Sequence, residues 1–486
     1  ALQVMTSLAE KEALKGQVQT IYFDPPYGIN FASNWQSTVD EKSSLAAGKT
    51  ELSREPEVVK AFRDTWSDGI NTYLSYLRER LIVCRELLTS SGSLFVQMGE
   101  DNVHLVRSVL DEVFGSDCHV VTILLKKKGS QKSSFIDPVN DYILWYSKTS
   151  RHLQGSIKFN RLFEARNLDK DTIDEFSLVE LPDNSVHPIH STPNLYGEYL
   201  DFRLRPNKLF DEYPDAKLFR PWPITNGGSR ANQNDPVAFR GNLYNPPQGR
   251  CWSHTSRQAQ GRSGMERVNV AGRLVAYGKS LDFKRYFDDF PYKSISNWWD
   301  GLGGASRPVY VVQTNEEIVK RCILLTSDPG DLVLDPTCGS GTTAVVAERW
   351  GRRWITMDTS RVALALARAR LMGARFPYFV LADSEEGERK RAERDKAEPR
   401  QDSFGGRLNE GFVYRKAAHI TSGVVANNAE IDTIYDHWQE TLEPLREKLN
   451  QLLGTDWAEW QIPREPGQDW SEEARRVHAE WWDGRQ

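Results

Sequence analysis

Residues 18–27 read Val-Gln-Thr-Ile-Tyr-Phe-Asp-Pro-Pro-Tyr, and this stretch decides how the chain folds. The run 18–23 is rich in apolar and β-branched residues and predicts a buried strand that stops at Asp24. The Pro-Pro pair that follows holds the next residues in an extended loop, because proline fixes its own backbone and restricts the residue before it. A second buried strand, 332–334, runs into a loop that opens with Asp335. The chain therefore carries two segments in which a strand ends at an aspartate.

Helical and strand patterns alternate around these two segments. Apolar residues at helical spacing predict helices over 71–88, 102–114, 316–327, 342–350 and 361–372, and short apolar runs predict strands over 93–98, 120–125, 142–146 and 354–357. Such alternation predicts an α/β fold with a Rossmann-like, doubly wound, mostly parallel sheet.

This alternation breaks between residues 151 and 305, where Pro, Gly, Asn, Arg and aromatic residues are frequent and periodicity is weak. Residues 384–410 are highly charged and predict a linker or surface excursion, and acidic helical stretches with tryptophans follow them. The two sheet halves on either side of the break must pair in space to complete one sheet. We expect four parts: a catalytic half at 1–150, a loop-rich insertion at 151–305, a cofactor-binding half at 306–385, and a linker with a helical extension at 386–486.

Composition limits the classes of protein to consider. The 486 residues carry a formal net charge of −5, which argues against a chain coated in basic residues but permits a local nucleic-acid contact. No apolar run reaches the length of a membrane span, and the opening from Ala1 lacks the basic and apolar regions of a leader. The five cysteines stand singly, so we expect no metal site and buried reduced thiols in a cytoplasmic protein.

The Gly339-Ser340-Gly341 turn follows a strand and opens a helix, where glycines allow a tight turn and a close approach to a ligand. Asp358 ends the next strand, and a carboxylate there can accept hydrogen bonds from ribose hydroxyls. The full G-x-G-x-x-G spacing is absent, which disfavours NAD. No lysine follows Gly341, which disfavours a phosphate-gripping P-loop. An ordinary strand–helix turn is the alternative, and the combination with Asp358 favours a ligand-binding loop.

The segment Asp24-Pro25-Pro26-Tyr27 resembles the catalytic motif of enzymes that methylate an exocyclic amine of a nucleic-acid base. Residues 335–341 resemble the S-adenosylmethionine loop of the same enzymes. The order, catalytic motif first, resembles the β-class DNA amino-methyltransferases. The long reach between the motifs resembles the modification subunits of type III restriction–modification systems, over most of 1–385. The resemblance implies a circularly permuted S-adenosylmethionine-dependent methyltransferase fold with target recognition in 151–305.

The same resemblance implies S-adenosyl-L-methionine as cofactor, with Asp335 near its methionine amino group. The usual Thr-x-Lys-Pro-like motif before the helix at 316 is absent, and Thr314 and Asn315 are its natural substitutes. An acidic residue for the adenine ring of the cofactor is expected at Asp383 or upstream of Ala1, where relatives carry a Gly-Asp-Asn strand. The expected cofactor-binding set is Asp335, Pro336, Thr337, Cys338, Gly339, Ser340, Gly341, Asp358, Thr314 and Asn315.

The catalytic set implied by the resemblance is Asp24, Pro25, Pro26 and Tyr27. An exocyclic amine is a poor nucleophile because its lone pair is delocalised into the ring, so it needs acceptors for its protons. Asp24 offers a carboxylate, Pro25 a backbone carbonyl, and Tyr27 a ring on which a flipped-out base can stack. In the family, Asp at the first position favours N6 of adenine and Ser favours N4 of cytosine.

Double-stranded DNA is the expected partner. Residues 121–170 hold ten Lys/Arg against four Asp/Glu, and Lys126, Lys127, Lys128 and Lys132 are the expected phosphate contacts. The resemblance predicts a site-specific adenine-N6 DNA methyltransferase of a bacterial or archaeal restriction–modification or phage-defence system. The alternatives are an N4-cytosine or RNA-base methyltransferase, or a DNA-recognition subunit serving a nuclease–helicase partner. A homodimer is a further expectation.

Overall fold

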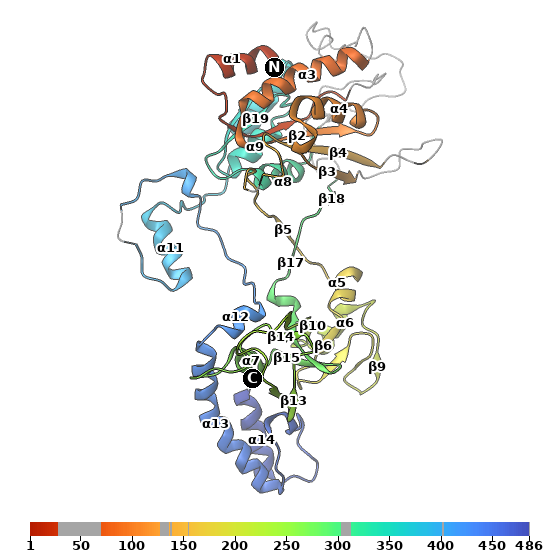
Figure 1. The fold of residues 1–486 in the computed structure, drawn as a ribbon, viewed down its shortest axis with the longest axis vertical. Coiled ribbons are helices and arrows are strands. Elements are labelled where there is room, and N and C mark those ends of the chain that lie inside the picture. Colours follow the sequence, from red (N-terminus) through yellow and green to blue (C-terminus); the bar gives the residue numbers. More distant parts are fainter. Residues whose placement is uncertain are drawn as a thin grey trace. The chain divides into compact units, whose positions relative to one another are not determined.

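The computed structural model describes residues 1–27, 70–126, 136, 139–153, 155–302, 313–400 and 403–485. The chain divides into two compact units. Unit 1 contains residues 1–164 and 294–415, and unit 2 contains residues 165–293 and 416–486. Each unit is therefore assembled from segments that lie far apart in the sequence (Figure 1).

Unit 1 is built on a seven-stranded sheet in the order β18-β3-β4-β2-β1-β19-β20. Only β4 runs antiparallel to its neighbours β2 and β3, and the remaining pairs are parallel. The prediction of an α/β sheet is confirmed, and the sheet is mixed rather than purely parallel. Its strands are β1 (Val18–Phe23), β2 (Leu88–Gly99), β3 (His119–Lys126), β4 (Asn140–Ser147), β18 (Trp298–Trp299), β19 (Leu332–Asp335) and β20 (Arg353–Thr356).

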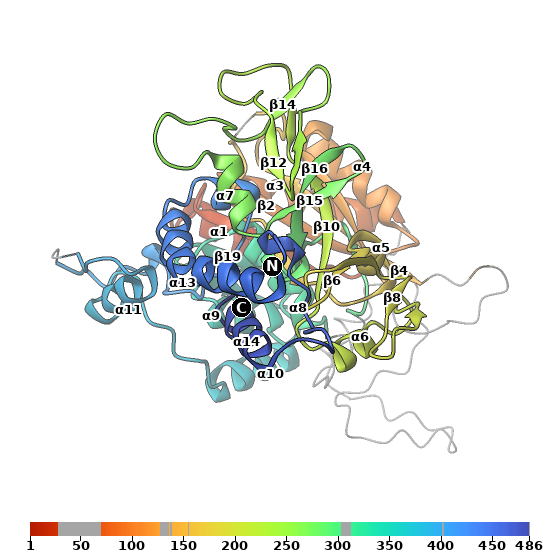
Figure 2. The same cartoon turned by 90° about the horizontal axis from the view of Figure 1, so that it is seen from below.

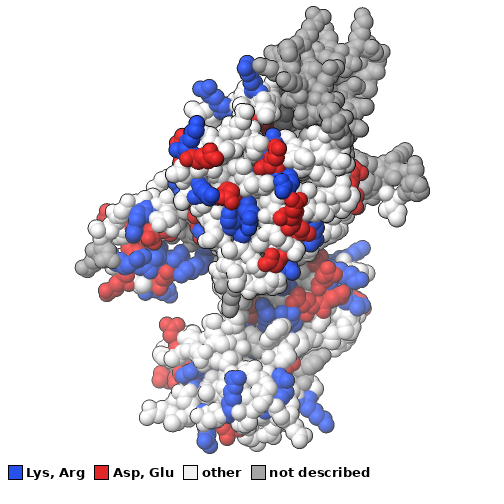
Figure 3. Space-filling view, turned by 45° about the horizontal axis from the view of Figure 1, so that its top comes forward, with Lys and Arg blue, Asp and Glu red and all other residues white. Residues whose placement is uncertain are grey.

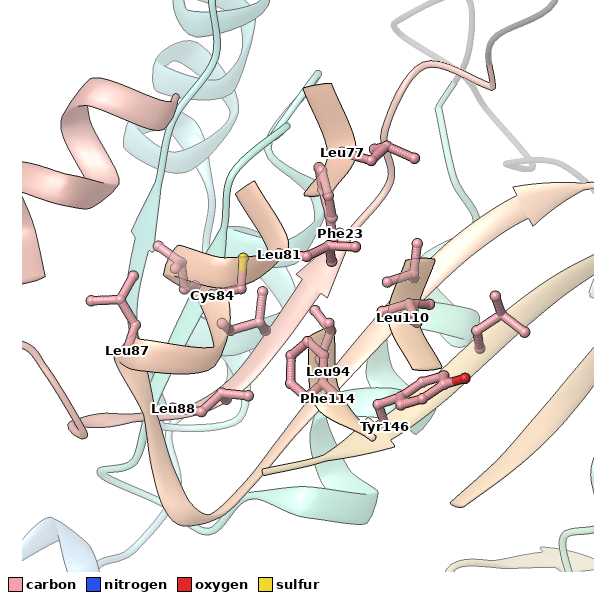
Figure 4. Packing of buried hydrophobic residues seen from close by; sticks show 14 of the residues in the cluster. Phe23, Leu77, Leu81, Cys84, Leu87, Leu88, Leu94, Leu110, Phe114 and Tyr146 are labelled. Atoms are coloured by element: carbon pink, nitrogen blue, oxygen red, sulfur yellow. The ribbon is translucent and has the colours of Figure 1, made fainter. Parts of the chain in front are cut away.

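Helices cover both faces of this sheet. Alternate residues of β1 point to opposite faces, so Phe23 packs under the helices of one side and Tyr22 under those of the other. Figure 4 shows Phe23 among Leu77, Leu81 and Leu94 on the first side. Each fully buried side chain of this size stabilises the fold by about 1.5–3 kcal/mol. The first face packs α1 (Leu2–Glu10), α3 (Ile70–Leu87) and α4 (Val103–Phe114), and the second packs α8 (Glu316–Thr326) and α9 (Thr342–Arg349).

The predicted helices and strands of unit 1 match the observed ones closely, but β18 lies in the predicted insertion and two other stretches differ. The helix from Ile70 ends at Leu87, and β2 already begins at Leu88, ahead of the predicted start at 93. The charged stretch 384–410 carries α11 (Glu385–Asp395), which Ser384 caps by accepting a hydrogen bond from the backbone of Gly387. The last helix before that stretch is α10 (Arg361–Gly373).

Unit 2 contains a five-stranded antiparallel sheet in the order β15-β16-β10-β6-β7, together with short hairpins. The α13 and α14 helices lie side by side in both views (Figures 1 and 2) and bury a tryptophan-rich core around Trp481 and Trp482. The sheet strands are β6 (Leu178–Glu180), β7 (Val186–Pro188), β10 (Lys217–Pro223), β15 (Leu274–Tyr277) and β16 (Ser280–Tyr286). The helices are α5 (Lys170–Glu175), α6 (Pro206–Glu212), α7 (Gly264–Val270), α12 (Ser422–Ala426), α13 (Glu430–Leu453) and α14 (Glu472–Arg485).

The units change at 164/165, 293/294 and 415/416, whereas the sequence predicted boundaries at 150/151, 305/306 and 385/386. The main difference is that the C-terminal helices share a core with the inserted segment. Ala426 and Val425 of α12 pack with Trp252 and Met265. Periodicity within 416–486 cannot reveal this, because the partner of the apolar face lies in another part of the chain.

Across the part of the chain that the structure describes, no helix combines the length and the apolar character needed to cross a membrane.

The shared core of unit 2 makes a prediction about stability. Ala426 is 1% exposed, whereas Val424 on the same helix is 55% exposed. We expect Ala426→Asp to destabilise unit 2 by about 3–5 kcal/mol, the cost of an uncompensated buried charge. Hydrogen exchange should then show loss of protection in 224–283 while the strands of unit 1 stay protected. The matched control Val424→Asp should change stability by less than about 0.5 kcal/mol. Equal behaviour of the two variants would contradict the shared core.

Candidate active site at the edge of the unit 1 sheet

The two aspartate-opened loops meet at one edge of the sheet. Strands β1 and β19 are parallel neighbours, with Thr20 opposite Val333 and Ile21 opposite Leu334. The carboxyl ends of parallel strands lie at the same edge, so Asp24 and Asp335 emerge side by side. The backbone N–H of Asp24 donates to Thr337 Oγ1 over 3.2 Å, which joins the first loop to the second.

The Asp24 carboxyl group lies in a largely desolvated setting. Burial raises its pKa to about 7, and the negative charges of Asp335 and Asp141 add to this shift. Two hydroxyl groups oppose it: Thr314 Oγ1 donates to Asp24 Oδ2 over 2.9 Å, and the nearby Tyr27 hydroxyl also lowers the pKa of Asp24. Around neutral pH, Asp24 can therefore exist as a proton acceptor or as a neutral acid.

Tyr27 is held by residues at the end of β2 and just after it. The sequence analysis singled out none of them. Gln97 Nε2 donates to the Tyr27 hydroxyl over 2.9 Å, and Asn102 Nδ2 donates to the Tyr27 carbonyl over 2.7 Å. A Cβ at Gly99 would lie 3.1 Å from the Tyr27 ring, so glycine leaves room for that ring. Within the motif itself, Pro25 is buried and Pro26 is exposed.

The glycine loop is fixed mainly by its own backbone. Gly339 and Gly341 have φ of +49° and +78°, in the left-handed region that favours glycine. The Thr337 N–H donates to Asp335 Oδ1 and the Gly339 N–H donates to Asp358 Oδ2, both over 2.9 Å. Burial raises the pKa of Asp335 to about 7, and the nearby charge of Asp358 also raises it. The structure thus brings Asp335, Gly339 and Asp358 together, as the sequence predicted.

The other residues of the loop set take several positions. Asn315 caps α8 by accepting from the Glu317 N–H over 2.9 Å, and Thr314 bonds Asp24 rather than the glycine loop. Cys338 is buried, and burial raises the pKa of its thiol to about 12. Pro336 and Ser340 are buried as well.

Arg370 of α10 is a further residue of this site that the sequence analysis missed. Its Nη1 donates to the carbonyl and the hydroxyl of Ser340, each over 2.9 Å, and to Thr342 Oγ1 over 3.2 Å. Its Nη2 pairs with Glu316 over 3.0 Å, and Glu316 also pairs with Arg349. A single arginine in a helical pattern gives no local sign of a functional role. Only the fold could show that Arg370 contacts the glycine loop.

Asp383 and Lys126, two of the expected contact residues, each have a partner within the chain. Asp383 Oδ2 accepts from the Gly405 N–H and from the backbone and side chain of Arg407, so this carboxylate closes the loop that follows α11. Lys126 pairs with Asp300 over 2.9 Å on an exposed surface. Lys127, Lys128 and Lys132 lie outside the described residues.

Residues 18–369 match the family model described as a DNA methylase. The Type II methyltransferase M.EcaI of Enterobacter cloacae is 26% identical over 374 residues, which cover 74% of this chain and 66% of that protein. The Mod subunit of the type III restriction-modification enzyme StyLTI of Salmonella typhimurium is 23% identical and covers 67% of this chain. The match spans 46% of that subunit, so the chain spans about half to two thirds of these relatives.

Among solved structures, the DNA modification methylase TTHA0409 of Thermus thermophilus is 15% identical to this chain. The two align over 76% of this chain and 90% of that one, with a TM-score of 0.33.

The packing of the glycine loop predicts an asymmetry between two glycines. A Cβ at Gly341 would lie 2.8 Å from the Cβ of Ala367, at a φ that alanine disfavours, whereas a Cβ at Gly373 would meet nothing within 4 Å. We expect Gly341→Ala to destabilise the α9–α10 region by about 1–3 kcal/mol. Hydrogen exchange of those helices in increasing urea measures this loss. Gly373→Ala should be neutral or slightly stabilising, and a neutral Gly341→Ala would disprove the close contact.

Proposed function

Because the chain belongs to the DNA methylase family, we propose that it transfers a methyl group from S-adenosylmethionine to the N6 amine of a flipped-out adenine in DNA. It would act at a specific sequence, within a bacterial or archaeal restriction–modification or phage-defence system. The observation that carries this proposal is the contact between the two loops, Asp24 N–H to Thr337 Oγ1. It sets a partly buried proton acceptor beside a glycine loop. The order of the loops along the chain supports a circularly permuted methyltransferase fold.

The loop residues fit S-adenosylmethionine. The left-handed Gly339 and Gly341 leave the loop without side chains that would obstruct a ligand. Asp358 accepts backbone N–H groups from Gly339 and Ser360, one on each oxygen, and each oxygen keeps a second lone pair for a ribose hydroxyl. Asp335 offers a carboxylate to an amino group. When bound, S-adenosylmethionine supplies a methyl group on a sulfonium sulfur. The sulfur keeps the electron pair of the broken bond and leaves as a neutral thioether.

Asp24 performs the central step on the target base. As a carboxylate it accepts a hydrogen bond from the amine, which localises the nitrogen lone pair, and it then takes the proton that the amine loses on methylation. The Pro25 carbonyl is the proposed acceptor for the second amine proton. Tyr27 offers its ring as a stacking surface for the base, worth about 1–3 kcal/mol.

We further propose that unit 2 reads the DNA sequence and that a separate nuclease–helicase subunit supplies cleavage. StyLTI Mod is a subunit of a restriction-modification enzyme, which supports a multisubunit assembly for its relative here. Basic and acidic groups are intermixed on the face that Figure 3 shows. The formal net charge of the chain is −5, so we place the DNA contacts at a local site. Phosphate contacts through Lys126, Lys127, Lys128 and Lys132 remain part of the proposal.

Five arginines of unit 2 are engaged by other groups of the protein. Arg203 pairs with Asp201, Arg262 with Asp436 and Arg273 with Asp289. Arg220 pairs with Glu175, and Arg250 bonds Thr225. Arg205 and Arg240 form no ion pair with another described residue. The arginines that can contact DNA are therefore limited by how many lack a partner within the protein, rather than by how many the segment contains.

One surface of the unit 2 sheet has unbalanced positive charge beside an exposed aromatic ring. Arg220 of β10 lies directly opposite Arg285 of β16, and such like-charged pairs are unfavourable across strands. Both guanidinium groups lie over Trp222, at 4.6 and 5.4 Å from its ring, and this tryptophan is 45% exposed. Glu175 is shared by Arg220 and Arg166, and Arg285 pairs with no described carboxylate. A DNA phosphate with its adjoining sugar or base fits this surface.

The activity is tested with purified protein, a radiolabelled methyl donor and mixed genomic DNA, followed by nucleoside analysis. We expect label in N6-methyladenine. Label in N4-methylcytosine would establish the alternative base, and label only with an RNA substrate would exclude DNA. The transfer rate should rise with pH through about 7, because Asp24 accepts the proton only when ionised, and its pKa is about 7.

Asp24→Ala should lower methyl transfer by about 100-fold or more, because it removes the proton acceptor. Affinity for S-adenosylmethionine, measured by calorimetry, should stay within about threefold. The control is Glu112→Ala, which removes an exposed carboxylate paired with Arg78 and should leave both quantities unchanged. Loss of cofactor binding in Asp24→Ala would reassign Asp24 to a structural or cofactor role.

The surface formed by Arg220, Trp222 and Arg285 predicts two separable effects on DNA binding. Arg285→Gln should weaken binding and reduce the slope of log affinity against log salt by about 1, because one phosphate contact is lost. Trp222→Ala should weaken binding by about 1–3 kcal/mol with the slope unchanged. The control Arg203→Gln removes an exposed arginine that is already paired with Asp201 and should have little effect. Equal effects of Arg203→Gln and Arg285→Gln would contradict a local site.

A further inference from the structure

A buried glutamine links two tyrosines next to the catalytic aspartate. Gln97 of β2 is 7% exposed and Tyr22 of β1 is 2% exposed. The Tyr22 hydroxyl donates to Gln97 Oε1, and Gln97 Nε2 donates to the Tyr27 hydroxyl over 2.9 Å. Both ends of the amide are thus used, and the chain of hydrogen bonds runs from the sheet interior to the catalytic loop.

The chemistry of an amide fixes the direction of this chain. An amide nitrogen only donates, so the Tyr27 oxygen accepts from Gln97 and its own proton is available for another acceptor. The nearest candidate is Asp24, because the Tyr27 hydroxyl lowers the pKa of that carboxyl group. If the amide were absent, the Tyr27 hydroxyl could rotate and take a different partner.

We propose that Gln97 is a positioning residue that turns the Tyr27 hydroxyl proton toward Asp24. The inference rests on the proposed role of Asp24 as proton acceptor. Tyr27 then has two tasks, because its ring faces the base while its hydroxyl supports the catalytic carboxylate. Gln97 does not contact the substrate and acts only through the Tyr27 hydroxyl.

The charged and polar groups around Asp24 set the direction of the expected effect. Asp335 of β19 and Asp141 of β4 disfavour its ionised form, as does burial. The hydroxyl of Thr314 favours the ionised form by donating to it, and the Tyr27 hydroxyl also lowers the pKa of Asp24. Loss of one hydroxyl donor raises the pKa of Asp24 above about 7, so a larger fraction becomes protonated at neutral pH.

The test is a double-mutant cycle on the pH dependence of methyl transfer. Gln97→Met keeps the approximate volume but removes both hydrogen bonds, and Tyr27→Phe keeps the ring but removes the hydroxyl. Each single variant should move the acidic limb of the rate profile up by about one pH unit. In the Tyr27→Phe background, Gln97→Met should cause no further shift, because the hydroxyl that it orients is already gone.

A purely structural role for Gln97 would lower thermal stability in both backgrounds and leave the acidic limb in place, which would overturn the proposal. An equal shift from Gln97→Met in both backgrounds would also overturn it. A second readout is independent of transfer. The pKa of Asp24 can be followed by infrared spectroscopy, with the Asp24→Ala variant subtracted to isolate the signal of this carboxyl group. Gln97→Met should raise this pKa in the same direction as it moves the rate profile. If this titration shifts but no variant or parent methylates DNA, the proposed function fails while the positioning role stands.

Discussion

The parallel pairing of β1 with β19 is the interaction on which the rest of the structure depends. These strands come from the two separate sequence segments of unit 1, and the whole of 165–293 lies between them. Closing so long a loop costs conformational entropy, although the cost grows only slowly with loop length. Burial of Phe23 and Leu334 on one face and Tyr22 and Val333 on the other offsets it.

The same pairing creates an electrostatic conflict at the sheet edge. Burial makes Asp24 and Asp335 both harder to ionise than a solvated aspartate, and the charge of Asp335 adds to the effect on Asp24. Hydroxyl and backbone donors, such as Thr314 and the Thr337 N–H, partly compensate. A stable fold gains nothing from two such carboxyl groups, and a proton-transfer site requires one near neutrality. This is the physical reason to place the chemistry here.

Ion pairs explain why composition predicts DNA contacts poorly. Arginines such as Arg267 and Arg273 contribute to the tertiary structure of unit 2 by pairing with Asp432 and Asp289. An arginine already paired with a carboxylate gains less from a phosphate, because the internal pair must first be broken. The unmatched charge at Arg285, next to an exposed ring, is therefore more informative than the count of basic residues.

The sequence by itself determined most strands and helices of unit 1, the loops at Asp24 and Gly339, and the acidic residue Asp358. Strand periodicity, proline pairs and glycine turns are local signals, and the family resemblance rests on those same short motifs. The family match over 18–369 confirms that resemblance. The roles of the expected site residues and of the four predicted parts remain predictions. Only the tertiary structure decided that β4 runs antiparallel, that 416–485 packs with the insertion, and that Thr314 bonds Asp24. It also brought Gln97 and Arg370 to the site. A glutamine in a strand and an arginine in a helix are locally ordinary residues. Their importance comes from side chains that are distant in the sequence, and such contacts exist only once the sheet has formed.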